Sequence, residues 1–199
     1  MCIRDRSRGG EAQWPVVDGY FSAQQGGAIR TKESFADFQL HLEFATPEHP
    51  AGSGQSRGNS GVLINGMYEV QILDSYQNPT YPDGQCGALY GQMPPRVNAC
   101  RPPGEWQTYD VIFESPRWNE SGELIRKAAV TVLHNGLVLH HRQEYLGGTD
   151  GIGSVPHKSL AAYTKPHPPE VFIELQDHGN LLRYRNIWIR ELGSYDQAE

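Results

Sequence analysis

The chain has 199 residues, of which 38% are hydrophobic and 20% charged, and its formal net charge is −6. This composition predicts a folded domain with its own core and excludes an intrinsically disordered chain. The mild acidity argues against a nucleic-acid partner, which needs a basic face. No apolar run approaches about 18 residues, so the sequence predicts no membrane-spanning helix.

The ends of the chain differ from its middle. Residues 1–8 are charged and lack the apolar stretch of a signal peptide, and they show no strand or helix periodicity. We therefore expect one domain over residues 14–192, with residues 1–13 and 193–199 as flexible tails. The sequence leaves open whether residues 1–8 are native.

The first half of the chain carries strand signals. Residues 14–31 contain one or two short strands broken by glycines. The segment from Phe38 to Phe44 alternates apolar and polar residues, which predicts a half-buried strand. Residues 45–59 are a loop, and Asn65-Gly66 predicts a tight hairpin turn between strands at 61–64 and 67–73.

The second half continues the pattern. It predicts a strand over 107–114, a hairpin with its turn at Asn135-Gly136, and a last strand pair formed by 170–176 and 181–191. Long loops at 75–105 and 146–168 separate these elements, and loops of that length are usually functional. Ten to twelve short strands without a helix longer than one turn predict an antiparallel sandwich.

The polar residues of two strands are candidates for chemistry. In the segment from Tyr68 to Asp74, Glu69 and Gln71 share one face because side chains alternate along a strand. Glu174, Gln176 and His178 share a face of a later strand. If both strands lie in one sheet, their residues suffice for proton transfer; the alternative is a solvent-facing surface.

Direct glycosidase chemistry and metal binding remain alternatives. Glu69, Gln71 and Asp74 resemble the Glu-x-Asp-x-x-Glu pattern of bulged-strand β-glucanases, but Gln71 replaces the central aspartate and weakens two-carboxylate chemistry. The eight histidines show no metal-binding spacing. If a divalent metal ion is bound, Glu69 and His178 are the first candidate ligands.

Three further features leave two interpretations each. Trp106 either stacks on a sugar ring or packs in the core. Arg57 either binds an anionic oxygen or is solvated. Cys86 and Cys100 either form a disulfide in an exported protein or remain two small thiols, and no pair of the three cysteines has zinc-ligand spacing.

Four motifs together resemble the 3-keto-disaccharide hydrolase domain family, formerly a domain of unknown function. They are residues 57–62 (RGNSGV), 68–75 (YEVQILDS), 98–110 with RPPGEWQTYD, and 175–188 with LQDHG and RNIW. The resemblance covers residues 14–192. It implies a concanavalin-like jelly roll that acts on glycosides oxidised at C3 of the sugar, and a bacterial protein of the periplasm or the cell exterior.

The implied chemistry assigns roles to these residues. A C3 ketone acidifies the C2 proton, so that a base and an acid drive β-elimination of the C1 substituent, and water then adds. We expect Glu69 and His178 to be the base and the acid, in an order that the sequence leaves open; a divalent metal ion is a candidate enolate stabiliser. The expected substrate-binding residues are Arg57, Asn59, Gln71, Asp74, Tyr90, Asn98, Trp106 and Gln176.

The expected partners are a small carbohydrate substrate and a sugar 3-dehydrogenase that supplies the ketone. Three alternatives stay open. They are a non-catalytic carbohydrate-binding module, a direct β-glucanase-type glycosidase using Glu69 and Asp74, and a structural sandwich.

Overall fold

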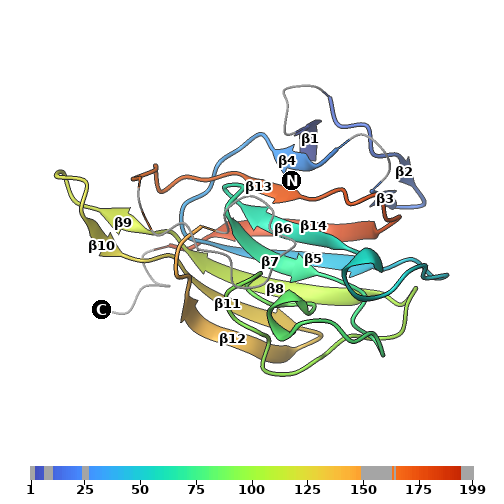
Figure 1. The fold of residues 1–199 in the computed structure, drawn as a ribbon. Coiled ribbons are helices and arrows are strands. Elements are labelled where there is room, and N and C mark those ends of the chain that lie inside the picture. Colours follow the sequence, from blue (N-terminus) through green and yellow to red (C-terminus); the bar gives the residue numbers. More distant parts are fainter. Residues whose placement is uncertain (1–2, 7–10, 24–26, 149–162, 164, 194–199) are drawn as a thin grey trace.

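The computed structural model describes residues 3–6, 11–23, 27–148, 163 and 165–193. Two antiparallel sheets pack face to face (Figure 1), which confirms the predicted all-β jelly-roll sandwich. Helix in the described part is confined to two single turns, η1 (Gly54–Ser56) and η2 (Pro82–Gly84). None of the helices found in this part is long and apolar enough to cross a membrane.

The smaller sheet has five strands, in the order β1-β4-β13-β6-β7. One of them, β1, lies within the segment 1–13 that the sequence assigned to a tail, and it pairs with β4. The strands of this sheet are β1 (Ile3–Arg6), β4 (Ile29–Thr31), β13 (Ile173–Leu175), β6 (Ser60–Ile64) and β7 (Tyr68–Ile72).

The larger sheet has seven strands, in the order β12-β11-β8-β5-β14-β3-β2. They are β12 (Leu137–Glu144), β11 (Ala129–His134), β8 (Gln107–Glu114), β5 (Phe38–Ala45), β14 (Arg183–Glu191), β3 (Tyr20–Ser22) and β2 (Val16–Val17). A separate hairpin of β9 (Arg117–Trp118) and β10 (Leu124–Arg126) was not predicted from the sequence.

Local sequence explains the central strands and their turns. The apolar residues of β5 are at most 1% exposed, while the residues between them are half-buried, as the alternation predicts. Both predicted hairpin turns form. Asn65 and Gly66 have φ of 57° and 65°, and Asn135 and Gly136 have φ of 51° and 79°, the left-handed pair that a two-residue type I′ turn requires.

The predicted pairing of the last two strands is wrong. β13 pairs with β4 and β6 in the five-stranded sheet, whereas β14 pairs with β5 and β3 in the seven-stranded sheet. The corner at residues 177–180 therefore carries the chain from one sheet to the other. Both strands turn apolar residues toward the same core, so hydrophobic alternation alone does not distinguish a hairpin from a crossover.

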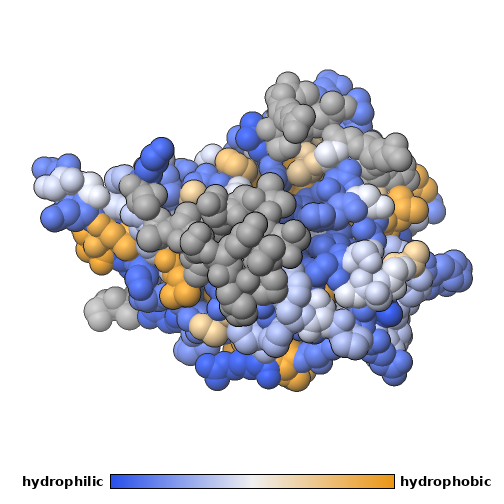
Figure 2. All heavy atoms as spheres, viewed as in Figure 1, coloured by the Kyte–Doolittle hydropathy of each residue, from blue (hydrophilic) through white to orange (hydrophobic). Residues whose placement is uncertain are grey.

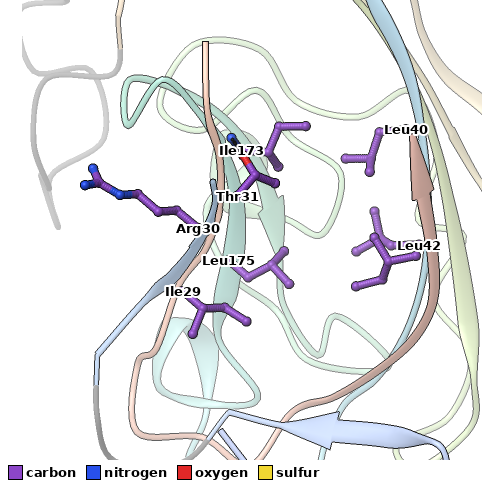
Figure 3. A pocket seen from close by; sticks show the side chains of 8 residues that line it. Ile29, Arg30, Thr31, Leu40, Leu42, Ile173 and Leu175 are labelled. Atoms are coloured by element: carbon purple, nitrogen blue, oxygen red, sulfur yellow. Dashed lines mark hydrogen bonds between the residues drawn. The ribbon is translucent and has the colours of Figure 1, made fainter. Parts of the chain in front are cut away.

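The core between the sheets is closely packed. Figure 3 shows Ile173 and Leu175 of one sheet facing Leu40 and Leu42 of the other, while Arg30 points away. The cavity between them has a volume of about 10 Å³, which is barely the room that one water molecule needs. It is a packing gap and not a ligand site.

The outer surface in the view of Figure 2 is mostly hydrophilic, and its apolar residues lie in small separate patches. Exposed apolar side chains such as Val16, Ile125 and Leu137 belong to different parts of the fold. Scattered apolar residues are ordinary on a protein surface. The buried polar groups are the stronger candidates for a functional site.

Candidate active site

Strand β7 is buried on both faces. Tyr68, Val70 and Ile72 face the seven-stranded sheet, and Glu69 and Gln71, on the opposite face, are only 6% and 1% exposed. The loop after β7 runs along its edge: the backbone N–H of Gln71 donates to the Ala88 carbonyl at 3.0 Å. A carboxyl and an amide in a buried position are informative, because such groups are costly to bury.

The register of the sheet brings the polar residues of β13 to the same face. Gly61 on β6 lies opposite Gln71, and the Gln176 N–H donates to the Gly61 carbonyl at 3.0 Å. Two residues further along β6, Leu63 lies opposite Glu69 of β7 and Glu174 of β13. Residues directly opposite each other share a face. The polar residues of β7 and those of β13 and its end therefore lie on one face of the sheet, with β6 between them.

Gly61 leaves room between two polar side chains. A Cβ atom at this position would lie 2.6 Å from Glu69 Oε1 and 2.8 Å from Gln176 Oε1. The two oxygens thus approach the same point above Gly61, and they are no further apart than the sum of those distances. His178 Nε2 lies 3.0 Å from Gln176 Oε1. Glu69, Gln176 and His178 form a continuous row, which we call the acid–amide–imidazole row.

Burial determines the charge state of Glu69. It raises the pKa of this carboxyl group from 4.5 to about 8, because a buried carboxylate loses its hydration. No hydrogen bond joins the Glu69 side chain to another residue in the described part of the chain. Burial therefore favours the protonated form of Glu69 at neutral pH.

Tyrosines surround Glu69. The hydroxyls of Tyr81 and Tyr90 are 2.6 Å apart, and the Tyr145 hydroxyl donates to the Glu69 carbonyl at 3.4 Å. Burial is the main cause that raises the pKa of each of these tyrosines, and the nearby Glu69 charge adds to it. The tyrosines stay neutral and provide hydrogen-bonding groups around the carboxyl.

The environment of His178 favours the neutral imidazole. Partial burial lowers its pKa from 6.5, and the Asp177 carboxylate opposes this change. With Gln176 Oε1 as acceptor, the neutral ring donates through Nε2, so Nδ1 holds the lone pair; this tautomer is assigned from the hydrogen bond. His178 is a neutral base at the open end of the row.

Gln55 organises the polar groups beside Gln71. Its Oε1 accepts from Gln71 Nε2 at 3.0 Å, its Nε2 donates to the Gly84 carbonyl at 2.8 Å, and its carbonyl accepts from Asn59 Nδ2 at 2.7 Å. Gln71 Oε1 and Asn59 Oδ1 are buried acceptors without a partner in the described part of the chain. Such acceptors are rare in native proteins and are suited to the hydroxyl donors of a ligand.

Two predicted substrate-binding residues bind each other. Arg57 Nε donates to Asp74 Oδ2 at 2.7 Å, and Arg57 Nη2 donates to the Tyr76 carbonyl at 2.6 Å. The other Asp74 oxygen accepts from the Tyr76 N–H at 3.1 Å. These contacts close the loop after β7 and occupy both carboxylate oxygens of Asp74.

Two more predicted residues lie elsewhere. Asn98 donates to the Ser75 carbonyl and accepts from the Cys100 N–H, at 2.7 and 3.1 Å, which shapes its own loop. Trp106 packs under the guanidinium of Arg185, 4.0 Å from the ring centroid, beside the seven-stranded sheet. The structure thus brings Glu69, Gln71, Asn59, Tyr90, Gln176 and His178 to one region and leaves Arg57, Asp74, Asn98 and Trp106 outside it.

Sequence reasoning missed Gln55 and Gly61 as site residues. Gln55 lies in a loop without periodicity, and the importance of Gly61 depends on its cross-strand neighbours. Among the described residues, neither Glu69 nor His178 belongs to a group of three or more metal-ligating side chains.

Comparison with known proteins identifies the family. Residues 4–190 match the 3-keto-alpha-glucoside-1,2-lyase-like domain. A crystal structure of a "putative glycosyl hydrolase" from Parabacteroides distasonis ATCC 8503 is 45% identical, with a TM-score of 0.86 over 96% of this chain and 79% of that one.

Two other structures from that organism carry the same description. One is 26% identical with a TM-score of 0.65 and covers 90% of each chain. The other is 20% identical with a TM-score of 0.66, covers 96% of this chain and 88% of that one, and supports the fold alone. A search of curated proteins returned no match. The match over residues 4–190 shows that the chain belongs to the 3-keto-alpha-glucoside-1,2-lyase-like domain family.

Proposed function

We propose that the protein cleaves the glycosidic bond of 3-keto-glycosides or 3-keto-disaccharides by elimination followed by hydration. Family membership and the glycosyl hydrolase description of the similar structures support glycoside cleavage. The observation that supports the proposal is the acid–amide–imidazole row, because a carboxyl group and an imidazole both lie near the side-chain oxygen of Gln176.

The reaction follows from the protonation states of Glu69 and His178. His178 Nδ1 removes the C2 proton of the sugar, and the electron pair moves into an enolate at the C3 ketone. The C1–O bond then breaks as Glu69 gives its proton to the departing oxygen. Water adds a hydroxyl at C1 and a proton returns to C2, so the net reaction consumes one water and releases an alcohol and a 3-keto-sugar. This order makes His178 the base and Glu69 the acid.

Substrate binding uses the remaining polar groups. The buried acceptors Gln71 Oε1 and Asn59 Oδ1 accept hydrogen bonds from sugar hydroxyls, which satisfies two groups that are otherwise without partners. The hydroxyls of Tyr81 and Tyr90 lie near Glu69 and orient the sugar against the carboxyl. We propose that a sugar 3-dehydrogenase supplies the ketone, and that the reaction takes place in the bacterial periplasm or outside the cell.

A second candidate is direct hydrolysis of unoxidised glycosides. Glu69 and Glu174 lie on one face with β6 between them, which separates their backbones by about 9–10 Å. Two glutamates on strands so spaced can reach the carboxyl separation of about 6.5–9.5 Å found in inverting glycosidases, whereas retaining enzymes need about 5–5.5 Å. The retaining pair of Glu69 and Asp74 is not favoured, because Arg57 and the Tyr76 N–H occupy Asp74.

One experiment separates these functions. The protein is incubated in D₂O with 3-keto-trehalose and, separately, with trehalose, and products are followed by NMR. Elimination and hydration release 3-keto-glucose with one deuterium at C2, above the level of exchange without enzyme. Glu69→Gln and His178→Asn should abolish release, while His41→Gln, on the outer face of the seven-stranded sheet, should not affect it.

The other outcomes are equally clear. Cleavage of trehalose itself would support the second candidate, and cleavage of the keto-sugar without deuterium at C2 would contradict the elimination step. Binding of both sugars without turnover would identify a carbohydrate-binding module instead.

A further inference from the structure

A second group of reactive side chains lies outside the proposed active site. The ligand atoms of Cys86, Cys100 and His134 all lie within 4.8 Å of one another. Cys86 and Cys100 belong to the long loop between β7 and β8, and His134 ends β11. Cys86 and His134 are 1% and 0% exposed. The group therefore joins the loop to the seven-stranded sheet inside the protein.

The ring of His134 is oriented by Gln107. Gln107 Oε1 accepts from the Arg101 backbone N–H at 3.0 Å, which identifies that atom as the amide oxygen. The same oxygen lies 2.9 Å from His134 Nε2, so Nε2 carries the proton. His134 Nδ1 then has a free lone pair, and it is buried without a partner in the described part of the chain. Metal-ligating histidines are typically held in this way.

The two sulfurs have only weak partners. Cys86 Sγ lies 3.0 Å from the Tyr109 hydroxyl, which itself donates to the Gln71 carbonyl at 2.7 Å. Cys100 Sγ lies 3.8 Å from the Leu73 carbonyl. Both cysteines are free thiols in the structure. Thiols are poor hydrogen-bonding groups. Metal binding by these sulfurs therefore gains more free energy than the loss of their hydrogen bonds costs.

We propose that Cys86, Cys100 and His134 form a structural zinc site, with Tyr109 Oη or a water molecule in the fourth position. Zn²⁺ binding releases the two thiol protons to solvent, and the two thiolates cancel the charge of the ion. A monovalent soft ion such as Cu⁺ would leave a net negative charge in this buried position, which is costly. The ligand types are those of known zinc sites.

The proposed ion explains how a long loop is held over the active site. The loop between β7 and β8 carries Tyr81 and Tyr90 next to Glu69, and the zinc ion would fix it to β11 at two points. The proposal does not depend on the reaction proposed above, and metal binding is measured without a substrate.

The test is a metal titration of the reduced, metal-free full chain. One equivalent of Co²⁺ should give the thiolate-to-cobalt charge-transfer absorption, and Zn²⁺ should displace it and raise the Tm. In competition with a chromophoric chelator, His134→Gln and Cys100→Ser should each weaken zinc binding by about 100-fold or more. His41→Gln removes a histidine that pairs with Asp110 on the outer face of the seven-stranded sheet, whereas Tyr109 and His134 face the core. It is the control and should bind zinc as wild type does.

Three results would overturn the proposal. The first is wild-type protein without the charge-transfer absorption, a measurement that does not depend on the folding of any variant. The second is unchanged zinc affinity in His134→Gln. The third is a Cys86–Cys100 disulfide in protein purified without reductant, combined with no zinc binding after reduction, which would assign the two cysteines to a redox cross-link.

Discussion

At the scale of single residues, the site depends on a carboxyl group that is kept neutral. Glu69 lies under the loop after β7, and in the described part of the chain burial is the cause that raises its pKa to about 8. Folding therefore favours the protonated form. The burial that would prepare Glu69 for the proposed proton donation also lowers the stability of the folded protein at alkaline pH.

Replacing Glu69 should separate stability from activity. The folded protein binds the Glu69 proton more tightly than the unfolded chain, so stability is fully present below pH 4.5 and falls as the pH rises to about 8. Glu69→Gln is neutral at every pH. We expect it to be inactive, yet about 4 kcal/mol more stable than wild type at pH 8 and nearly equal at pH 4.5. Urea unfolding at both pH values measures this, and a destabilised variant at pH 8 would contradict it.

The pH profile of the wild type tests the roles of acid and base. His178 must be neutral and Glu69 protonated, so kcat/KM should rise as His178 loses its proton below pH 6.5 and fall around pH 8 as Glu69 ionises. The measurement is kcat/KM for a 3-keto-disaccharide between pH 5 and pH 9.5. Activity that keeps rising above pH 9 would exclude Glu69 as the acid.

Gly61→Ala tests the space between the acid and the amide. The new Cβ would lie 2.6 Å from Glu69 Oε1 and 2.8 Å from Gln176 Oε1, so both side chains must move. We expect a loss of at least about 100-fold in kcat/KM, because misplacement by about 1 Å costs that much. Gly136→Ala, in a hairpin turn with φ of 79° and open space around the new Cβ, should lose about 1–2 kcal/mol of stability but keep wild-type activity. Equal activity in both variants would contradict the arrangement above Gly61.

At the scale of elements, the hairpin of β6 and β7 and the loop that follows it form one functional unit. The turn at Asn65-Gly66 sets the register that places Gly61 opposite Gln71. The loop then returns along the edge of β7 through backbone bonds. An ion pair at the start of this loop fixes its path, and that is the role the structure supports for Arg57 and Asp74.

Arg57→Ala should affect stability and not substrate binding. The side chain of Asp74 is 1% exposed and that of Arg57 is 17% exposed, so the substitution leaves a buried carboxylate unpaired. We expect a loss of about 3 kcal/mol in the free energy of unfolding. Arg142→Ala, whose ion pair with Glu114 is solvent-exposed, should lose less than about 1 kcal/mol. The measurements are urea unfolding and KM at a temperature where both variants are folded.

An increase in KM without loss of stability in Arg57→Ala would contradict this assignment. It would return Arg57 to the substrate-binding role that its sequence motif suggested.

At the scale of the whole molecule, the packing of two sheets supports the candidate site. β13 brings Gln176 and His178 to the five-stranded sheet, and the corner after it passes the chain to β14 in the other sheet. The geometry of the candidate site therefore depends on the hydrophobic core between the two sheets. A cavity of about 10 Å³ remains in this core between β13 and β5.

Leu42→Ala should weaken the contact between the sheets. Leu42 is 1% exposed and lines the gap opposite β13, so the substitution enlarges a cavity that already exists. We expect a loss of about 3 kcal/mol in the free energy of unfolding. Leu137→Ala, at a side chain that is 52% exposed, should change it by less than about 0.5 kcal/mol. Urea unfolding of both variants measures the difference, and similar values would contradict a shared core at this position.

The local features of this protein were predictable because they depend on neighbouring residues. Alternation identified β5, β7 and β8, and two Asn-Gly pairs identified the hairpin turns. Glu69 and Gln71 share a face in any strand with that sequence. The hairpin of β9 and β10 was missed because strands this short carry too little pattern.

Only the tertiary structure decided what depends on distant segments. It showed that residues 173–175 and 183–191 lie in opposite sheets, and that Arg57 and Asp74 bind each other. It also placed Gln176 across Gly61 from Glu69, and His134 beside Cys86 and Cys100, although the spacing of these cysteines suggested no zinc site. The sequence by itself determined strands, turns and faces through short-range sterics and hydrophobic alternation. Burial, pKa and ligand geometry came from contacts between segments that only folding brings together.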